Sequence, residues 1–128
     1  MCYLLSTLQY ELYMNRETFL KELKAQFPEA YSNIDDIDQG LLHLEMSAFR
    51  RWVESELATG GAWNCEKAFK FIEICLKRAD SSLENAIEIS FIEDLALGEH
   101  DMHIKKIVKD RAPKSIREKM EIAHEFWK

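Results

Sequence analysis

Two histidines stand three residues apart in a stretch that is also rich in acids. His100 and His103 have Glu99 and Asp101 beside them, and on a helix this spacing would place both imidazole rings on one face, as metal ligands require. Zinc needs at least one more ligand, and the chain has no H-E-x-x-H segment. The spacing therefore favours two surface histidines, and a small metal-dependent enzyme is the least favoured alternative.

Carboxylate pairs and nucleophiles give no stronger indication of catalysis. Glu84 and Glu88, or Glu93 and Asp94, are neighbours on a predicted helix, whereas acid–base catalysis needs two carboxyl groups in different environments across a pocket. The sequence contains neither a G-x-S-x-G nor an S-x-x-K nucleophile motif, and no glycine-rich phosphate loop. We therefore expect a protein that is not an enzyme and that needs neither a cofactor nor a metal.

The three cysteines predict the redox state of the chain. Cys65 and Cys75 would lie about 15 Å apart on one helix, which is too far for a disulfide, and Cys2 leaves an odd count. Reduced, buried thiols are typical of a cytoplasmic protein. No apolar run approaches the length of a membrane span.

Charge is distributed unevenly along the chain. The formal net charge is −6, and residues 28–101 hold sixteen acids and six bases, whereas residues 102–128 hold four acids and eight bases. The excess of acid argues against general binding of nucleic acid or of anionic membranes. Acids interleaved with the bases of residues 105–119 favour surface pairs at i,i+4 spacing. Whether this basic stretch joins an interface is left open.

The elements that would position these residues are predicted to be helices, because only 4 Gly and 2 Pro occur and sheet proteins need many tight turns. We expect an all-α single domain over residues 1–128, with six or seven helices packed as antiparallel hairpins around a buried central helix at about 81–97. Residues 1–13 are a candidate N-terminal extension, since a good helix start follows Met14. Helices are expected at 15–27, 39–58, 64–79, 81–97, 99–109 and from 113 onward, with a short turn of helix at 29–34.

Capping residues support these boundaries. Asn15, Asp38, Asn64 and Ser81 each precede an expected helix, and Ser81 with Glu84 has the spacing of a capping box. The helix at 81–97 is apolar around most of its circumference, which predicts that it is buried. Its two polar residues, Asn85 and Ser90, are therefore expected in an internal hydrogen-bond network.

Four short segments carry a resemblance to a known group. They are F-L-K-E-L at 19–23, F-R-R-W-V at 49–53, E-N-A-I-E-I-S-F-I-E-D-L at 84–95 and I-R-E-K-M at 116–120. From about Met14 onward the chain resembles a group of small helical bacterial proteins, which in turn resemble immunity proteins carried beside polymorphic or contact-dependent toxins. The resemblance implies a cytoplasmic immunity protein that neutralises a cognate toxin, and it carries over no functional residue.

The excess of acid in residues 28–101 suggests how such a protein would bind. Nuclease active sites are electropositive because they hold phosphates, so an acidic inhibitor can occupy that field and associate rapidly. Trp63, beside Gly60 and Gly61, is a candidate aromatic anchor, although a core position is equally consistent with its spacing. The alternative function is a regulatory or scaffold module that binds a protein other than a toxin. The acids expected at the interface are Asp35, Asp36, Asp38, Glu45, Glu54, Glu56, Glu99 and Asp101.

Overall fold

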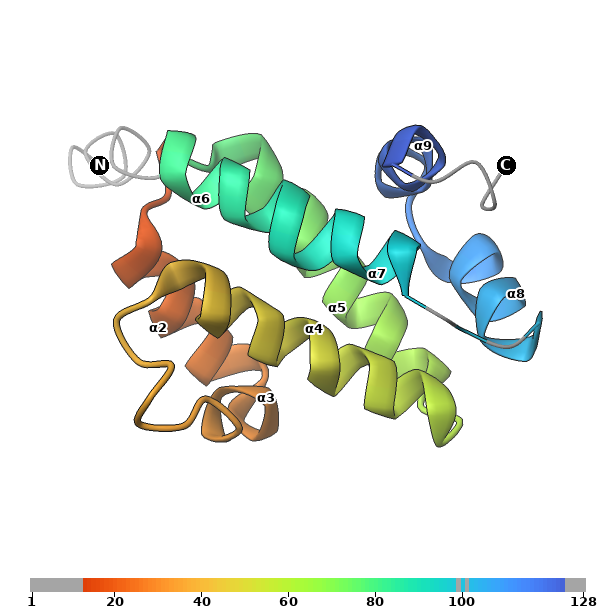
Figure 1. Ribbon diagram of the computed structural model, residues 1–128, viewed down its shortest axis with the longest axis horizontal. Coiled ribbons are helices and arrows are strands. Elements are labelled where there is room, and N and C mark those ends of the chain that lie inside the picture. Colours follow the sequence, from red (N-terminus) through yellow and green to blue (C-terminus); the bar gives the residue numbers. More distant parts are fainter. Residues whose placement is uncertain (1–12, 99, 101, 124–128) are drawn as a thin grey trace, which may run out of the picture.

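The computed structural model describes residues 13–98, 100 and 102–123, and these residues form an all-α fold (Figure 1). The predicted fold class is confirmed, and no described helix is long and apolar enough to cross a membrane. The helices are α2 (Arg16–Gln26), α3 (Pro28–Ser32), α4 (Leu42–Ala58), α5 (Ala62–Arg78), α6 (Ser81–Ala86), η1 (Ile87–Glu93), α7 (Asp94–Leu97), α8 (Met102–Arg111) and α9 (Lys114–Ala123).

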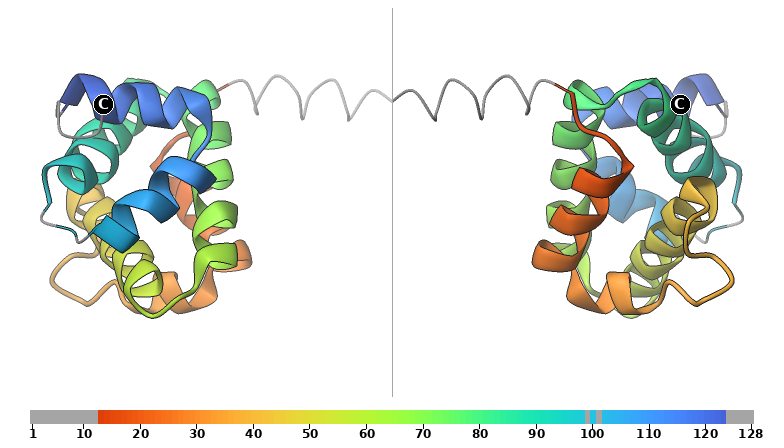
Figure 2. Two further views of the ribbon diagram at one scale, coloured as in Figure 1. Left: turned by 90° about the vertical axis from the view of Figure 1, so that its right-hand side faces the viewer. Right: turned by 90° about the vertical axis from the view of Figure 1, so that its left-hand side faces the viewer.

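The helices α6, η1 and α7 follow one another as a single rod through the molecule (Figure 1). This rod lies beside α4 and also contacts α9. The helices α4 and α5 form an antiparallel hairpin, and α8 and α9 close one end of the molecule (Figure 2). The rod is therefore the central helix that the sequence predicts, with its beginning and end as expected.

A cluster of aromatic rings forms the centre of the core. Phe49 of α4 is fully buried, and its ring centroid lies 5.3 Å from that of Phe27, 5.4 Å from that of Phe91 and 6.0 Å from that of Phe71. These rings come from α4, the α2–α3 junction, η1 and α5. The cluster therefore joins the N-terminal helices to the central rod.

The central segment η1 is a π-helix, which the sequence does not predict. The amide of Asp94 donates to the carbonyl of Ile89, five residues earlier, in the pattern of a π-helix. Burial of the rod is nearly as expected, because its apolar residues are enclosed except for Ile89 and Leu97, which are 42% and 53% exposed.

The capping predictions are confirmed at one position and wrong at three. Asn15 accepts a hydrogen bond from the amide of Thr18 at 2.9 Å. Asp38 and Asn64 cap nothing, because α4 begins after Leu41 and α5 after Gly61. At α6 the cap is Asp80 and not Ser81: the carboxylate of Asp80 accepts from the amide of Leu83 at 2.9 Å. Asp80 stands in the extended conformation that a cap requires, one residue earlier than expected.

The start of the described chain is attached to the α5–α6 junction. Met14 is 3% exposed, its amide donates to the carbonyl of Arg78, and its carbonyl accepts from the amide of Asp80 at 2.8 Å. These two bonds form an isolated parallel bridge. Most of the candidate extension, residues 1–12, lies outside the described residues.

Candidate functional site

The loop between α3 and α4, residues 33–41, carries the most exposed of the predicted interface acids. It is folded by local hydrogen bonds: the amide of Asp38 donates to the side-chain Oδ1 of Asp35 at 2.9 Å, and the amide of Leu41 donates to the carbonyl of Asp38 at 3.1 Å. Gly40 has a φ of +89°, a left-handed conformation that a side chain would strain. The loop therefore has a defined shape that depends on these local turns.

A buried carboxylate fixes this loop to the body of the protein. Glu45, in the first turn of α4, is 1% exposed. One of its oxygens accepts from Nε of Arg16 at 2.7 Å, and the other accepts from Nη2 of Arg16 at 2.7 Å and from the amide of Gly40 at 3.1 Å. The hydrogen bonds to Glu45 raise the pKa of the Arg16 guanidinium. We call this three-residue arrangement the clasp. It holds the loop between α2 and α4.

The clasp leaves acids and an apolar side chain on the outside of the loop. Asp35 and Asp36 are exposed, and between them and the clasp Ile37 is 83% exposed. Leu41 and Leu44 add apolar surface at the start of α4, with exposures of 54% and 40%. An acidic loop that is already hydrogen-bonded to the body of the protein and carries an apolar tip is suited to binding, because fewer conformations are lost on contact than for a free loop.

The other predicted interface acids do not add to the exposed acidic surface of this loop. Glu45 was expected on the surface, and that expectation is wrong because its carboxylate is the buried centre of the clasp. The Asp38 side chain is 16% exposed and lies 3.7 Å from Arg51. Glu54 is about one-quarter exposed and pairs with Arg50 at 2.6 Å. Glu99 and Asp101 lie outside the described residues.

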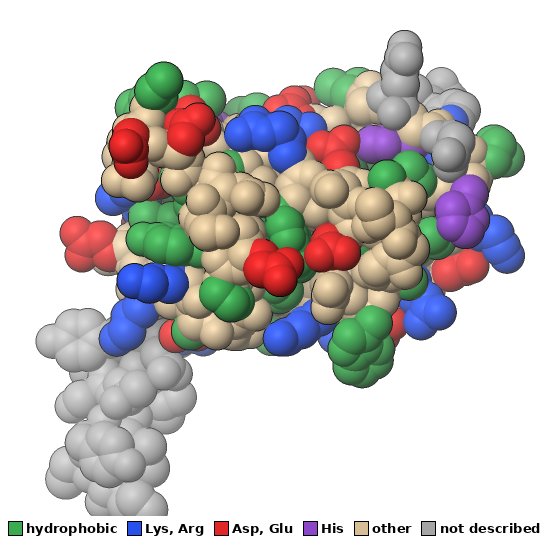
Figure 3. Space-filling model, turned by 90° about the horizontal axis from the view of Figure 1, so that it is seen from below, with side chains coloured by type: hydrophobic (Ala, Val, Ile, Leu, Met, Phe, Trp, Pro, Cys, Tyr) green, Lys and Arg blue, Asp and Glu red, His purple; other side chains and the backbone are tan. Residues whose placement is uncertain are grey.

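The face seen from below shows the same separation (Figure 3). Acidic side chains occur there at several separate places, with basic side chains between them. Glu56 lies in the last turn of α4, while the loop adjoins its first turn. On this face the acidic side chains do not form one continuous surface. Of the predicted interface acids that the structure describes, Asp35 and Asp36 are the exposed ones, and we therefore take the loop as the candidate binding surface.

Trp63 is a surface residue, as one of its two interpretations requires. It is 76% exposed in the first turn of α5. It follows the C-terminal end of α4, a helix of 17 residues and about 25 Å long. The structure thus places Trp63 and the loop at opposite ends of α4.

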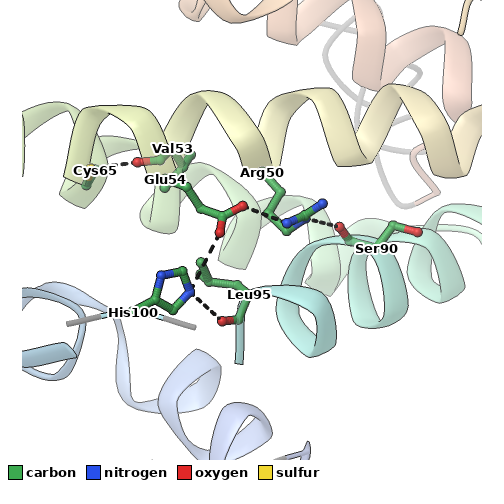
Figure 4. Close-up of polar contacts among 7 residues, drawn as sticks. All are labelled: Arg50, Val53, Glu54, Cys65, Ser90, Leu95 and His100. Atoms are coloured by element: carbon green, nitrogen blue, oxygen red, sulfur yellow. Dashed lines mark hydrogen bonds and ion pairs between the residues drawn. The ribbon is translucent and has the colours of Figure 1, made fainter. Parts of the chain in front are cut away.

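The two histidines of the candidate metal pair do not share a helix. α8 begins at Met102, after His100, so the i,i+3 argument fails. The His100 side chain is 6% exposed, and its Nε2 lies 3.0 Å from the carbonyl oxygen of Leu95 and 3.6 Å from Oε2 of Glu54 (Figure 4). His100 is therefore not the surface histidine that was expected, whereas His103 is exposed. Among the described residues no group of three metal-ligating side chains is placed to hold an ion.

The contact of His100 is part of a chain of polar groups between α4 and the central rod (Figure 4). Glu54 accepts from Nη1 of Arg50 at 2.6 Å, and Nε of Arg50 donates to the carbonyl of Ser90 at 3.2 Å. This series of polar contacts connects η1 to the segment that follows α7. It satisfies groups that are largely removed from water, which is a structural role.

The internal network predicted for Ser90 and Asn85 exists in part. Ser90 is 5% exposed, and its hydroxyl lies 2.7 Å from Nδ1 of His43. Nε2 of His43 lies 3.4 Å from Nδ2 of Asn85, but Asn85 is exposed and not buried as expected. These contacts attach the start of α4 to the central rod.

The buried cysteines give a test of the core. Burial raises the pKa of both Cys65 and Cys75 to about 12, and the thiolate is the reactive form. In a Cys2→Ser variant we expect negligible alkylation by iodoacetamide at pH 8 in the folded state and modification of both cysteines in denaturant, measured by intact mass. Rapid alkylation of the folded variant would contradict the burial of these thiols.

Comparison with known proteins gives a family and no activity. Residues 20–128 match the model of a domain of unknown function, DUF7674, so the chain belongs to the DUF7674 family. No curated protein matches the chain, and no solved structure does. The match covers the loop, the clasp residue Glu45 and the central rod, and it assigns no role to any of them.

Proposed function

We propose that this protein binds a basic partner protein through the loop at residues 33–41, and that it acts as an immunity protein that neutralises a bacterial toxin. A nuclease domain is the partner class we favour. The observation that carries the proposal is the clasp: a buried carboxylate holds an acidic loop whose tip, Ile37, is 83% exposed. An inhibitor that covers an active site needs a preformed binding surface and no catalytic residues of its own.

Both charge and apolar contact favour binding of such a domain to the loop. Asp35 and Asp36 would lie against the Lys and Arg side chains that hold phosphate in a nuclease, and opposite charges accelerate encounter. Ile37 would enter an apolar depression between those side chains. Because the loop is already ordered by the clasp, binding costs less conformational entropy than ordering a free loop would.

A charge-reversal series tests this proposal. The partner is the purified product of the gene that neighbours this one, and affinity is measured by surface plasmon resonance. Asp35→Lys with Asp36→Lys is expected to weaken binding by roughly tenfold or more, mainly through a slower association rate. Reversing Asp38 as well, in a second variant, extends the series to an acid that already faces Arg51.

The matched control is Glu93→Lys with Glu118→Lys, which changes the net charge equally at exposed residues away from the loop. An equal loss of affinity in the control and in the loop variant would mean that net charge and not the loop decides binding. Binding to a neighbouring-gene product that has no toxic activity would leave the loop as the interface and replace the immunity function with the scaffold alternative.

A further inference from the structure

The far end of the molecule carries a surface that is complementary to the loop. On α8, Met102, Lys106 and Lys109 follow one another at i, i+4 and i+7 and so lie on one helix face. Met102 is 77% exposed, and the Lys106 side chain is 75% exposed. An open hollow along this face is lined by these three side chains, among others. We call it the α8 face.

The charge of this end is opposite to that of the loop. Residues 102–123, all described, contain seven Lys or Arg and three Asp or Glu, a net charge of +4. Part of this positive charge is paired within the helices, at the i,i+4 spacing that the sequence predicts. Lys106 lies 3.7 Å from Asp110, and Lys114 lies 3.8 Å from Glu118. Such exposed i,i+4 pairs are weak, so the lysines can turn to an incoming carboxylate at little cost.

The two surfaces cannot meet within one molecule. The loop that precedes α4 lies at one end of the long axis, and α8 lies at the other (Figure 1). Contact between them therefore requires two copies of the chain. Where the copies join head-to-tail without closing into a ring, one loop and one α8 face stay free at the ends, so the assembly can continue to further copies.

We infer that the α8 face binds the loop of a second copy of this chain. Ile37 would lie against Met102 in the hollow, with Asp35 and Asp36 beside Lys106 and Lys109. The loop suits this face because the clasp already holds it in a defined shape and because its acids are opposite in charge to the lysines. This association would cover the loop that the proposed function assigns to a partner, but it needs no partner to be observed.

Sedimentation velocity of the purified full chain tests the inference. We expect the weight-average sedimentation coefficient to rise with protein concentration at low salt and to fall back toward the monomer value in about 1 M salt, where charges are screened within a few ångströms. Asp35→Asn with Asp36→Asn, or Lys106→Gln with Lys109→Gln, should each abolish the rise.

Mixing the two variants gives the decisive result. The intact α8 face of the first can bind the intact loop of the second, so the mixture should form a one-to-one dimer that does not grow. Lys21→Gln with Lys77→Gln removes the same charge at exposed sites elsewhere and should associate like the unmodified chain. A monomer at every concentration, or a dimer that survives both substitutions, would overturn the inference. Neither of these two results would contradict the proposed binding of a toxin, because sedimentation of this chain alone does not measure it.

Discussion

Replacement of Phe49 by alanine is expected to lower the free energy of unfolding by about 3–5 kcal/mol, the cost of a cavity at a fully buried phenylalanine. The ring of Phe49 is fully buried and contacts Phe19, Phe27, Phe71 and Phe91. These rings belong to four separate parts of the chain, so the cavity cannot close by the movement of one helix. Urea denaturation followed by circular dichroism measures the loss.

Trp63→Ala is the matched control for this substitution. It removes an aromatic side chain of greater size that is 76% exposed, and surface substitutions of this kind change stability by about 0.5 kcal/mol or less. A similar loss in both variants would mean that Phe49 is not the centre of the core. If Phe49→Ala is too unstable to purify, Phe49→Leu is expected to show a smaller loss of the same sign.

Glu45→Ala is expected to lower the free energy of unfolding by about 2–3 kcal/mol and to release the loop. The substitution leaves the guanidinium of Arg16 and the amide of Gly40 without their acceptor, and hydrogen bonds to charged groups are worth more than neutral ones. The loss should be below that of a fully buried ion pair, because the Arg16 side chain is 38% exposed and regains water.

Hydrogen exchange separates the clasp from general destabilisation. In Glu45→Ala the amides of residues 38–41 should exchange at least tenfold faster than in a variant destabilised equally elsewhere, while amides of α5 should exchange alike in both. Val53→Ala, a core substitution in α4 at a fully buried residue, is a suitable comparison. Unchanged exchange of the Gly40 amide would mean that the clasp does not order the loop.

A double-mutant cycle shows whether Arg16 acts through Glu45. If the two side chains stabilise the protein mainly by their mutual contact, then Arg16→Ala should cost little once Glu45 is already alanine. Additive losses would instead assign Arg16 a separate role in α2. The cycle thereby identifies the contact, and not merely the residues, as the source of loop order.

The helical elements could be predicted from the sequence, because they depend on residues that are neighbours along the chain. In α4 the apolar residues Met46, Phe49, Val53 and Leu57 recur at steps of three and four and are all buried, because this spacing places them on one face of a helix. The helix expected at 15–27 stops before Pro28, which begins α3. The composition of the 81–97 segment likewise predicts a buried rod, which is what α6, η1 and α7 form together.

Other features could not be predicted, because they depend on contacts between residues that are far apart in the sequence. Glu45 is a polar residue in the first turn of a helix, and by its pattern it belongs on the surface; it is buried because Arg16, twenty-nine residues earlier, donates two hydrogen bonds to it. His100 is turned inward by Glu54 and by the carbonyl of Leu95 for a similar reason. The π-helix η1 also has a distant partner, because Nε of Arg50 donates a hydrogen bond to the backbone carbonyl of Ser90 within it.

The candidate site shows the same division. The acids of the loop can be found in the sequence, because a turn is encoded within a few residues. Gly40, in contrast, falls inside the helix expected at 39–58, whereas in the structure it precedes α4 with a φ of +89°. The exposure of Ile37 and the attachment of the loop to the body of the protein cannot be found in the sequence, since both depend on where α2 lies relative to α4. Local pattern thus determined which segments form helices and turns, and long-range packing decided which charged side chain is a structural support and which is left free to bind.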